Sequence, residues 1–310
     1  MLGNMTTRAQ SCFVAVALLV GCFYWLRGGA YFWPDGNNLN AYTFTANYYH
    51  QPMMDCWRSR VLALKMSSAW TELRDKHQYK TEQDYRDCLA DTFASYHVFF
   101  LALIFGMLLA LKDPLVPLLG TVAGLFYSPA PYFQPYAFPW DFPVMLCFTA
   151  AFLAYRARNW WLVIAAVFVG GMIKESVLVA GLFLIGAPWN WYRRFGVVAI
   201  LGLLVFFLNG LLMPAGAHPS FMMNVVDWKL NLKVLTTDLR LAHPVFACAG
   251  GLALLLLFLC KVKDWPLRAV IAAFLAGEFF CGALQEFRIY GEILPLCWIV
   301  VSEKQRAKIR

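Results

Sequence analysis

The feature that most constrains this chain is a series of long apolar stretches. Two of them, Phe195 to Met213 and Pro244 to Cys260, carry no charge at all. They approach the roughly 20 residues that a membrane-spanning helix needs. The composition agrees, because 61% of the 310 residues are hydrophobic and only 14% are charged, against about 25% in globular domains. The sequence therefore predicts an integral membrane protein and excludes soluble enzyme folds.

The apolar stretches between charges predict an all-α, polytopic membrane helix bundle of about ten segments, built as a single domain over 1–310. The ten candidates are Ser11 to Leu26, His97 to Leu111, Pro114 to Tyr127, Phe142 to Tyr155, Trp160 to Ile173, Ser176 to Ala187, Phe195 to Met213, Pro244 to Cys260, Ala269 to Leu284, and Ile289 to Val301. Several are short, since a helix of 14 residues rises only about 21 Å and the hydrocarbon core is about 30 Å thick. Residues 160–187 fit either one long helix or two segments that meet at Lys174 and Glu175.

The basic residues between the stretches predict the orientation and favour two segments there. With ten segments and a cytoplasmic N-terminus, every short inside loop and the C-terminal tail are basic, as the positive-inside tendency requires. Nine segments would translocate Arg193, Arg194 and the basic tail. We therefore expect both termini in the cytoplasm, with a bacterial inner membrane as the location because no retention or transit signal is present. These loops account for the net charge of +8, so no nucleic-acid partner is expected.

Nearly all of the 18 acidic residues fall on the predicted outer face. Only three are clearly inside: Asp113, Asp264 and Glu303. The long first outer loop, 27–96, keeps regularly spaced apolar positions between Asp55 and Ala94, a pattern typical of amphipathic helices on a membrane surface. We therefore expect an outer cap of amphipathic helices, and we expect any chemistry on this face.

An adjacent lysine and glutamate, Lys174 and Glu175, lie between two apolar stretches. Charges at membrane depth are costly unless they are paired or face water. One interpretation is a solvated hairpin tip. The other is a pair inside a cavity, with Lys174 as a point charge for a phosphate and Glu175 as its partner or as a proton acceptor.

A second group of ionisable residues is crowded into the last predicted hairpin. Glu278 lies within one segment, Glu286 and Arg288 open the next, and Glu292 follows inside it. These residues form either an internal ion pair that holds the helices together or part of a functional site.

Two aspartates lie at the predicted outer ends of segments. Asp35 is in a Pro/Gly turn and Asp141 follows Trp140. Each has a simple structural interpretation, Asp35 as turn chemistry and Asp141 as a helix N-cap. The five histidines and nine cysteines show no metal-site spacing, and no P-loop or nucleophile elbow is present. Hydrolase, nucleotide-binding and zinc-site functions are therefore not expected.

The layout of these residues resembles the GT-C superfamily of integral membrane glycosyltransferases, which use polyprenyl-phosphate-linked sugars. Shared features are an early acid after the first segment, a large outer loop, an outer turn with a lysine, and a terminal Arg-Tyr segment. The matching pieces are Asp35 with Tyr42 and Ala46, Arg58-Ser-Arg60-Val-Leu, Ile173-Lys174-Glu175-Ser176, and Arg288-Ile-Tyr290 ending at Pro295.

This resemblance implies transfer of a sugar from a polyprenyl-phosphate or pyrophosphate donor to a glycan, lipid or protein acceptor on the outer face. A carboxylate would accept the proton of the acceptor hydroxyl, and Asp35 and Asp141 are the candidates. Either carboxylate also suits Mg or Mn as a ligand, so the cofactor is left open.

The departing phosphate needs cations. Lys174 and Arg288 are the first candidates, since the planar Arg fork binds two oxygens at once, and acidic neighbours would orient them. The full set of substrate-binding candidates is Lys174, Glu175, Arg288, Glu286, Tyr290, Arg58 and Arg60.

A proton- or ion-coupled membrane transporter is the main alternative. Lys174, Glu175, Glu278 and Glu292 are intramembrane ionisable residues of the kind that transporters use. Two related halves with broken helices would mark that class, and the sequence shows none. A third interpretation is a non-catalytic assembly subunit, whose acids would tolerate replacement.

Overall fold

The computed structural model describes residues 2–31, 60–74, 81–126, 139–212, 229, 232–233, 236, 249–259, 264–281 and 290–309. This part of the chain is all-helical and contains no strand. Its α-helices and 3₁₀ helices (η) are α1 (Leu2–Tyr31), α4 (Val61–Arg74), α5 (Glu82–Leu109), α6 (Leu115–Phe126), α7 (Asp141–Arg156), α8 (Trp160–Ile173), η2 (Glu175–Gly186), α9 (Trp191–Leu212), α12 (Ala249–Leu259), α13 (Trp265–Cys281), η4 (Gly291–Ile293) and α15 (Leu294–Ile309).

Within the described ranges, three helices are long and apolar enough to cross a membrane. The qualifying stretches are Arg8–Gly28 in α1, Asp87–Leu109 in α5 and Trp191–Leu212, which is the whole of α9. α6, α8 and η2 are apolar but shorter. Each of the ten apolar stretches found in the sequence overlaps one of the helices, with the last stretch divided between η4 and α15. The helices thus follow the uncharged stretches, as expected for a membrane protein.

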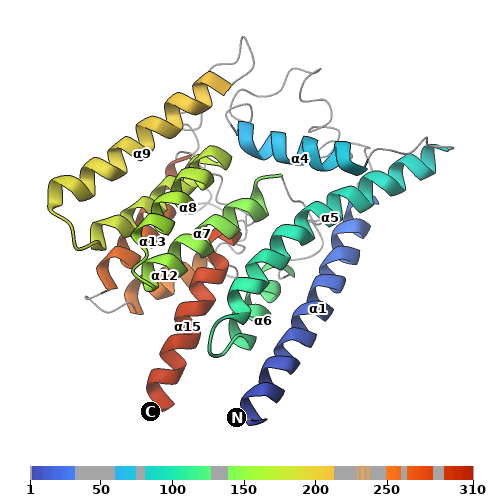
Figure 1. Cartoon of the computed structure of the whole chain (residues 1–310), viewed down its shortest axis with the longest axis horizontal. Coiled ribbons are helices and arrows are strands. Elements are labelled where there is room, and N and C mark those ends of the chain that lie inside the picture. The colour runs from blue at the N-terminus through green and yellow to red at the C-terminus, as the bar shows by residue number, and fades with distance from the viewer. Residues whose placement is uncertain are drawn as a thin grey trace.

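The loop predicted over 27–96 is shorter than the sequence indicated, because α5 begins at Glu82, well before His97. The side chain of Thr81 caps this helix by accepting a hydrogen bond from the backbone N–H of Asp84 at 3.1 Å. Residues 82–94 therefore belong to α5 and do not form a separate surface helix. Among the described residues of this loop, α4 is a helix separate from α5, and it lies across the end of the bundle opposite the two marked chain ends (Figure 1).

α8 and η2 form an antiparallel hairpin, which confirms two segments rather than one long helix. A Cβ on Gly170 would lie 2.4 Å from Val177 Cγ1, and one on Gly181 would lie 3.7 Å from Val167 Cγ1. These contacts join residues that lie at similar and increasing separations before and after residue 174, so the chain must reverse direction there. The small residue at 170 is what allows the two segments to approach so closely.

η2 is a 3₁₀ helix of 12 residues, which is long for this geometry. At about 2.0 Å per residue it rises about 24 Å, the same as the 16 residues of α7 at 1.5 Å per residue. The tighter winding therefore gives a short apolar stretch the reach of a longer α-helix. This is one physical answer to the short stretches that the sequence contains.

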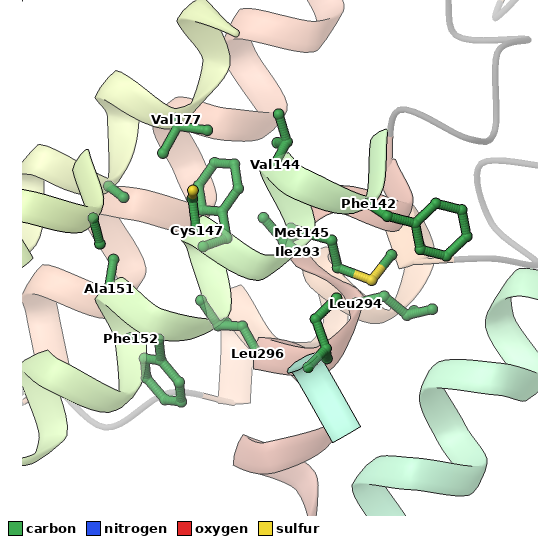
Figure 2. Close-up of a cluster of buried hydrophobic side chains, with 14 of the residues drawn as sticks. Phe142, Val144, Met145, Cys147, Ala151, Phe152, Val177, Ile293, Leu294 and Leu296 are labelled. Atoms are coloured by element: carbon green, nitrogen blue, oxygen red, sulfur yellow. The ribbon is translucent and has the colours of Figure 1, made fainter. Parts of the chain in front are cut away.

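α7 is the central helix of the core. It packs against α5, α8, η2, η4 and α15, and most of its side chains are buried. Figure 2 shows Met145 and Cys147 of α7 beside Val177 of η2 and Ile293 and Leu294 of the last segment, all of them apolar and buried. The core therefore holds together segments that lie far apart in the sequence.

Ion pairs lie at both ends of the bundle. Near the chain ends, Arg156 at the end of α7 pairs with Glu303 of α15, and its guanidinium is 4.0 Å from Asp264, just before α13. At the opposite end, Arg27 of α1 pairs with Asp91 and a second aspartate of α5. Helix ends that the charged loop residues place on the same predicted side of the membrane therefore lie next to one another.

Candidate functional site

The hairpin of α8 and η2 turns at a buried lysine. Lys174 has an extended backbone (φ −157°, ψ 137°) that ends α8, and its N–H donates to the carbonyl oxygen of Gly170 at 2.8 Å. The residue is only 7% exposed, while the side chain of the following Glu175 is 44% exposed. Lys174 therefore lies inside the protein, and only Glu175 fits a solvated hairpin tip.

Lys174 is held by an acid from the last segment of the chain. Its Nζ forms an ion pair with Oε1 of Glu292, a residue that is 1% exposed in η4. The hydroxyl of Ser176 donates to the other oxygen, Oε2, at 2.7 Å. Both oxygens of Glu292 are thus engaged, which fixes the position of the Lys174 ammonium.

A second buried cation reaches the hairpin from the start of α4. Arg60 is 8% exposed, and its Nη2 donates to Oε1 of Glu175 at 3.0 Å. Its guanidinium carbon lies 4.4 Å from the ring centroid of Trp140, a distance typical of a cation–π contact. The carbonyl oxygen of Pro139 accepts a hydrogen bond from the hydroxyl of Tyr96 at 2.9 Å. α5 therefore anchors the segment that carries this aromatic platform.

Two further acids complete the group. Glu278 of α13 is 9% exposed and interacts electrostatically with Lys174 and Glu292. Asp141, the first residue of α7, interacts electrostatically with Lys174. Tyr290 is buried and lies within electrostatic range of Glu278. We name the following residues the ionic cluster: Arg60, Asp141, Lys174, Glu175, Ser176, Glu278 and Glu292.

The pairing within the ionic cluster differs from the sequence interpretation. Lys174 is paired with Glu292 and not with its neighbour Glu175, whose partner is Arg60. Successive residues on either side of a chain reversal point in different directions, so adjacency in sequence did not make them partners. The interpretation of Glu292 as part of an ion pair within the last hairpin is likewise replaced by a pair across the bundle.

Several predicted site residues are brought together and others lie outside the described residues. Those that meet in or beside the ionic cluster are Arg60, Asp141, Lys174, Glu175 and Tyr290. Those outside the described residues are Asp35, Arg58, Glu286 and Arg288. Asp141 is the first helical residue of α7 and not its N-cap, which is Trp140. A negative charge in this first turn interacts favourably with the helix dipole.

Sequence reasoning considered Glu292 only within the last hairpin and for the transporter alternative, and it assigned no site role to Ser176 or Trp140. Glu292 carried a signal, since an acid inside an apolar segment is rarely accidental, but its partner is 118 residues away. Ser176 was visible only as part of the hairpin motif. Trp140 looked like one of many interfacial aromatic residues, and nothing in its local pattern indicated an arginine on its ring.

The arrangement offers two buried cations, each paired with a carboxylate, next to two further acids. Such cations suit an anionic ligand that can share or replace a carboxylate partner, and a buried acid beside them suits proton transfer. Within the described part of the chain, no three His, Cys, Asp or Glu residues are grouped closely enough to hold a metal ion.

Comparison of the chain with protein-family models, curated proteins and solved structures returned no match.

Proposed function

We propose that this protein is a membrane glycosyltransferase of the GT-C type, which moves a sugar from a polyprenyl-phosphate or pyrophosphate donor to an acceptor on the face opposite the chain ends. One observation carries the proposal. Lys174 and Arg60, two cations far apart in the sequence, are both buried, and each pairs with a carboxylate of the ionic cluster. Buried charge of this density in an apolar bundle is a functional-site hypothesis by default.

The proposed membrane arrangement has ten segments, with α4 as the outer cap. The pairs of Arg156 with Asp264 and Glu303 would then lie at the cytoplasmic end, and the ionic cluster at the other. This arrangement is supported because helix ends that the basic loops place on the cytoplasmic side lie next to one another. In this arrangement both termini are cytoplasmic, and a bacterial inner membrane is the proposed location.

In this proposal the cations bind the phosphate of the donor. Lys174 and Arg60 would be joined by Arg288 and Arg58, while Glu292 and Glu175 orient the first two. The phosphate would compete with the carboxylates for these cations, so donor binding would loosen the existing pairs. Phosphate oxygens accept charge-assisted hydrogen bonds from such cations just as carboxylates do, so a phosphate can take the place of a carboxylate partner.

A carboxylate of the outer face would accept the proton of the acceptor hydroxyl. Asp35 and Asp141 are the candidates, and support for Asp141 is its electrostatic proximity to Lys174. Tyr290 would help to close the site. The acceptor is a glycan, lipid or protein hydroxyl, and Mg or Mn at one of the aspartates would supply Lewis-acid chemistry if the enzyme needs it.

The test is sugar transfer from a defined polyprenyl-phosphate donor by the full-length protein in nanodiscs. Lys174→Ala is expected to lower kcat/KM at least about 100-fold, since electrostatic stabilisation by one group is typically worth that much. Lys112→Ala is the matched control, because Lys112 is an exposed lysine in the turn between α5 and α6. Equal activity of the two variants would reject the phosphate site.

A proton-coupled transporter is the second candidate, because a buried acid beside a buried Lys–Glu pair also suits proton movement. Proteoliposomes distinguish the two functions. Uptake of a sugar or lipid-soluble anion driven by a pH gradient, with no covalent transfer, would favour transport. A polyprenyl lipid that copurifies with the protein, identified by mass spectrometry, would favour the transferase.

A further inference from the structure

Two turns of the bundle bring arginines to the surface without any acidic residue. One turn joins α7 to α8 and contains Arg158, and the other joins η2 to α9 and leads into Arg193. The sequence has no acidic residue between Phe142 and Ile173 or between Ser176 and Val226. Within the described residues neither arginine forms an ion pair. Both are exposed, so these turns present positive charge that the described acids do not balance.

The two turns lie next to each other. The ring centroids of Trp160, the first residue of α8, and Trp189, in the turn before α9, are 6.3 Å apart. The guanidinium carbon of Arg193 lies 4.8 Å from the centroid of the Trp189 ring, which is a cation–π distance. Arg194 holds the same turn, because its Nε donates to the carbonyl oxygen of Trp189 at 2.6 Å. We name the following residues the basic aromatic surface: Arg158, Trp160, Trp189 and Arg193.

Arg158 occupies a backbone position that favours glycine. Its φ of 56° is the one positive value among the non-glycine residues that the structure describes, and it lies in the left-handed region. The N–H of Arg158 donates to the carbonyl oxygen of Tyr155 at 3.0 Å. The N–H of Asn159 donates to that of Ala154 at 2.9 Å, which completes a Schellman motif at the end of α7. Glycine is the usual residue there, so a cation at this strained position indicates a role for its side chain.

The basic aromatic surface continues into apolar helix faces. Trp161, in the first turn of α8, and Trp191, the first residue of α9, are each 72% exposed. Large apolar side chains are exposed farther along the same helices, among them Val169 of α8 and Phe195 and Ile200 of α9. α8 and α9 pack against each other. Exposed tryptophans between cations and apolar helix faces are typical of a membrane–water interface.

We propose that the basic aromatic surface binds the headgroup of an anionic phospholipid. The lipid phosphate accepts charge-assisted hydrogen bonds from the guanidinium groups of Arg158 and Arg193, and the acyl chains lie along the exposed faces of α8 and α9. A zwitterionic headgroup fits less well, because it brings a cation that no acid of these turns can bind. A soluble phosphate compound also fits less well, because it leaves the apolar faces uncovered.

The location agrees with this ligand. Arg158 follows Arg156, which pairs with Glu303 at the end of the bundle near the chain ends. In the proposed membrane arrangement that end is cytoplasmic, and the cytoplasmic leaflet carries a negative surface potential. The inference does not depend on sugar transfer, because lipid binding is measured without donor or acceptor.

Native mass spectrometry of the full-length protein tests the inference. The protein in detergent micelles is titrated with phosphatidylglycerol or with phosphatidylcholine of the same acyl chains, and wild type is expected to bind phosphatidylglycerol more tightly. Arg193→Gln and Arg158→Gly are each expected to lower that affinity about 5-fold, the contribution of one basic residue near an anionic membrane surface. Arg8→Gln is the matched control, since Arg8 is an exposed arginine of α1 outside the basic aromatic surface, and it is expected to keep the wild-type affinity.

The substitutions at Arg158 separate lipid binding from folding. Arg158→Gly relieves the left-handed backbone, so its unfolding temperature in phosphatidylcholine micelles is expected to equal or exceed that of wild type while its affinity for phosphatidylglycerol falls. Arg158→Ala removes the same charge but keeps the strain. It is expected to lose the same affinity and to unfold at a lower temperature than Arg158→Gly. Wild-type affinity in both variants at Arg158 and in Arg193→Gln overturns the inference.

The remaining outcomes distinguish a defined lipid surface from its alternatives. Equal affinity of wild type for the two lipids overturns the requirement for negative charge. A loss in Arg8→Gln as large as in Arg193→Gln shows diffuse attraction between a basic protein and an anionic lipid, which also overturns the inference. Glycerol phosphate, which has the phosphate but no acyl chain, is expected to displace little phosphatidylglycerol at an equal concentration. Full displacement assigns the surface to a soluble phosphate compound and overturns the choice of a lipid.

Discussion

The sharpest consequence for stability concerns the pair of Lys174 and Glu292. Glu292 is 1% exposed and Lys174 is 7% exposed, so Glu292→Gln leaves an ammonium group in the interior without its counter-charge. Removing one partner of a buried pair costs about 3–5 kcal/mol. Gln keeps the volume of Glu, and its carbonyl can still accept the hydrogen bond from Ser176. We therefore expect a loss near the lower end, about 3 kcal/mol.

The same reasoning predicts that removing both charges restores stability. Lys174→Met keeps most of the lysine stem but leaves Glu292 as a buried anion, so alone it is also expected to cost about 3 kcal/mol. The double variant Lys174→Met/Glu292→Gln buries no charge at this position. Since replacing a buried pair by neutral groups of similar volume is often harmless, its loss is expected to stay below that of either single variant.

The assay is reversible unfolding in mixed micelles, with helicity followed by circular dichroism. Glu303→Gln serves as the control, since it removes a glutamate from an ion pair whose side chains are 33% and 42% exposed. Partly exposed pairs contribute about 0–1 kcal/mol. A Glu292→Gln variant as stable as this control, or a double variant whose loss equals the sum of the two single losses, would refute a buried, mutually dependent pair.

Two further predictions concern packing and the end of the bundle opposite the chain ends. Gly120→Ala is expected to destabilise the protein by about 1–3 kcal/mol, because its Cβ would lie 2.2 Å from Cδ2 of Trp298. Gly106→Ala has nothing within 4 Å and is expected to be neutral or stabilising by about 0.5–1 kcal/mol, so equal losses in both unfolding curves would contradict this packing. Arg27→Gln removes partly exposed pairs with α5 and is expected to cost about 0–1 kcal/mol, less at high salt. A larger, salt-independent loss would show that Arg27 is more deeply engaged.

The positions of the helices could be predicted because membrane helices follow uncharged apolar stretches. Each of the ten stretches found in the sequence overlaps a helix, although the bounds differ. The start of α5 was not predicted, because the prediction followed uncharged stretches. The first turns of α5 carry acidic residues and resemble a surface helix. They are helical because Thr81 caps the helix and Arg27 pairs with Asp91, and neither contact is visible in a hydropathy pattern.

The ionic cluster could be predicted only in part. The residue types and the break at Lys174 were evident, because charges between apolar stretches stand out. The partners were not, since Arg60 and Glu175 are 115 residues apart and Lys174 and Glu292 are 118 apart. Which charges meet is decided by how α4, the hairpin and the last segment pack. The 3₁₀ winding of η2 also had no signal, because its apolar pattern is the same in either helix.

The difference between the two ends of the bundle bears on which charges are functional. The ion pairs of Arg156 near the chain ends are partly exposed. Solubility and membrane orientation alone are enough to explain charges at such positions. Lys174 and Glu292 are buried, and replacing a buried pair by apolar residues of similar volume often leaves a protein equally stable. Stability alone therefore gives no reason to keep this pair. The double variant Lys174→Met/Glu292→Gln should accordingly fold and yet lose sugar transfer, whereas a folded variant with full activity would show that the pair has no part in the reaction.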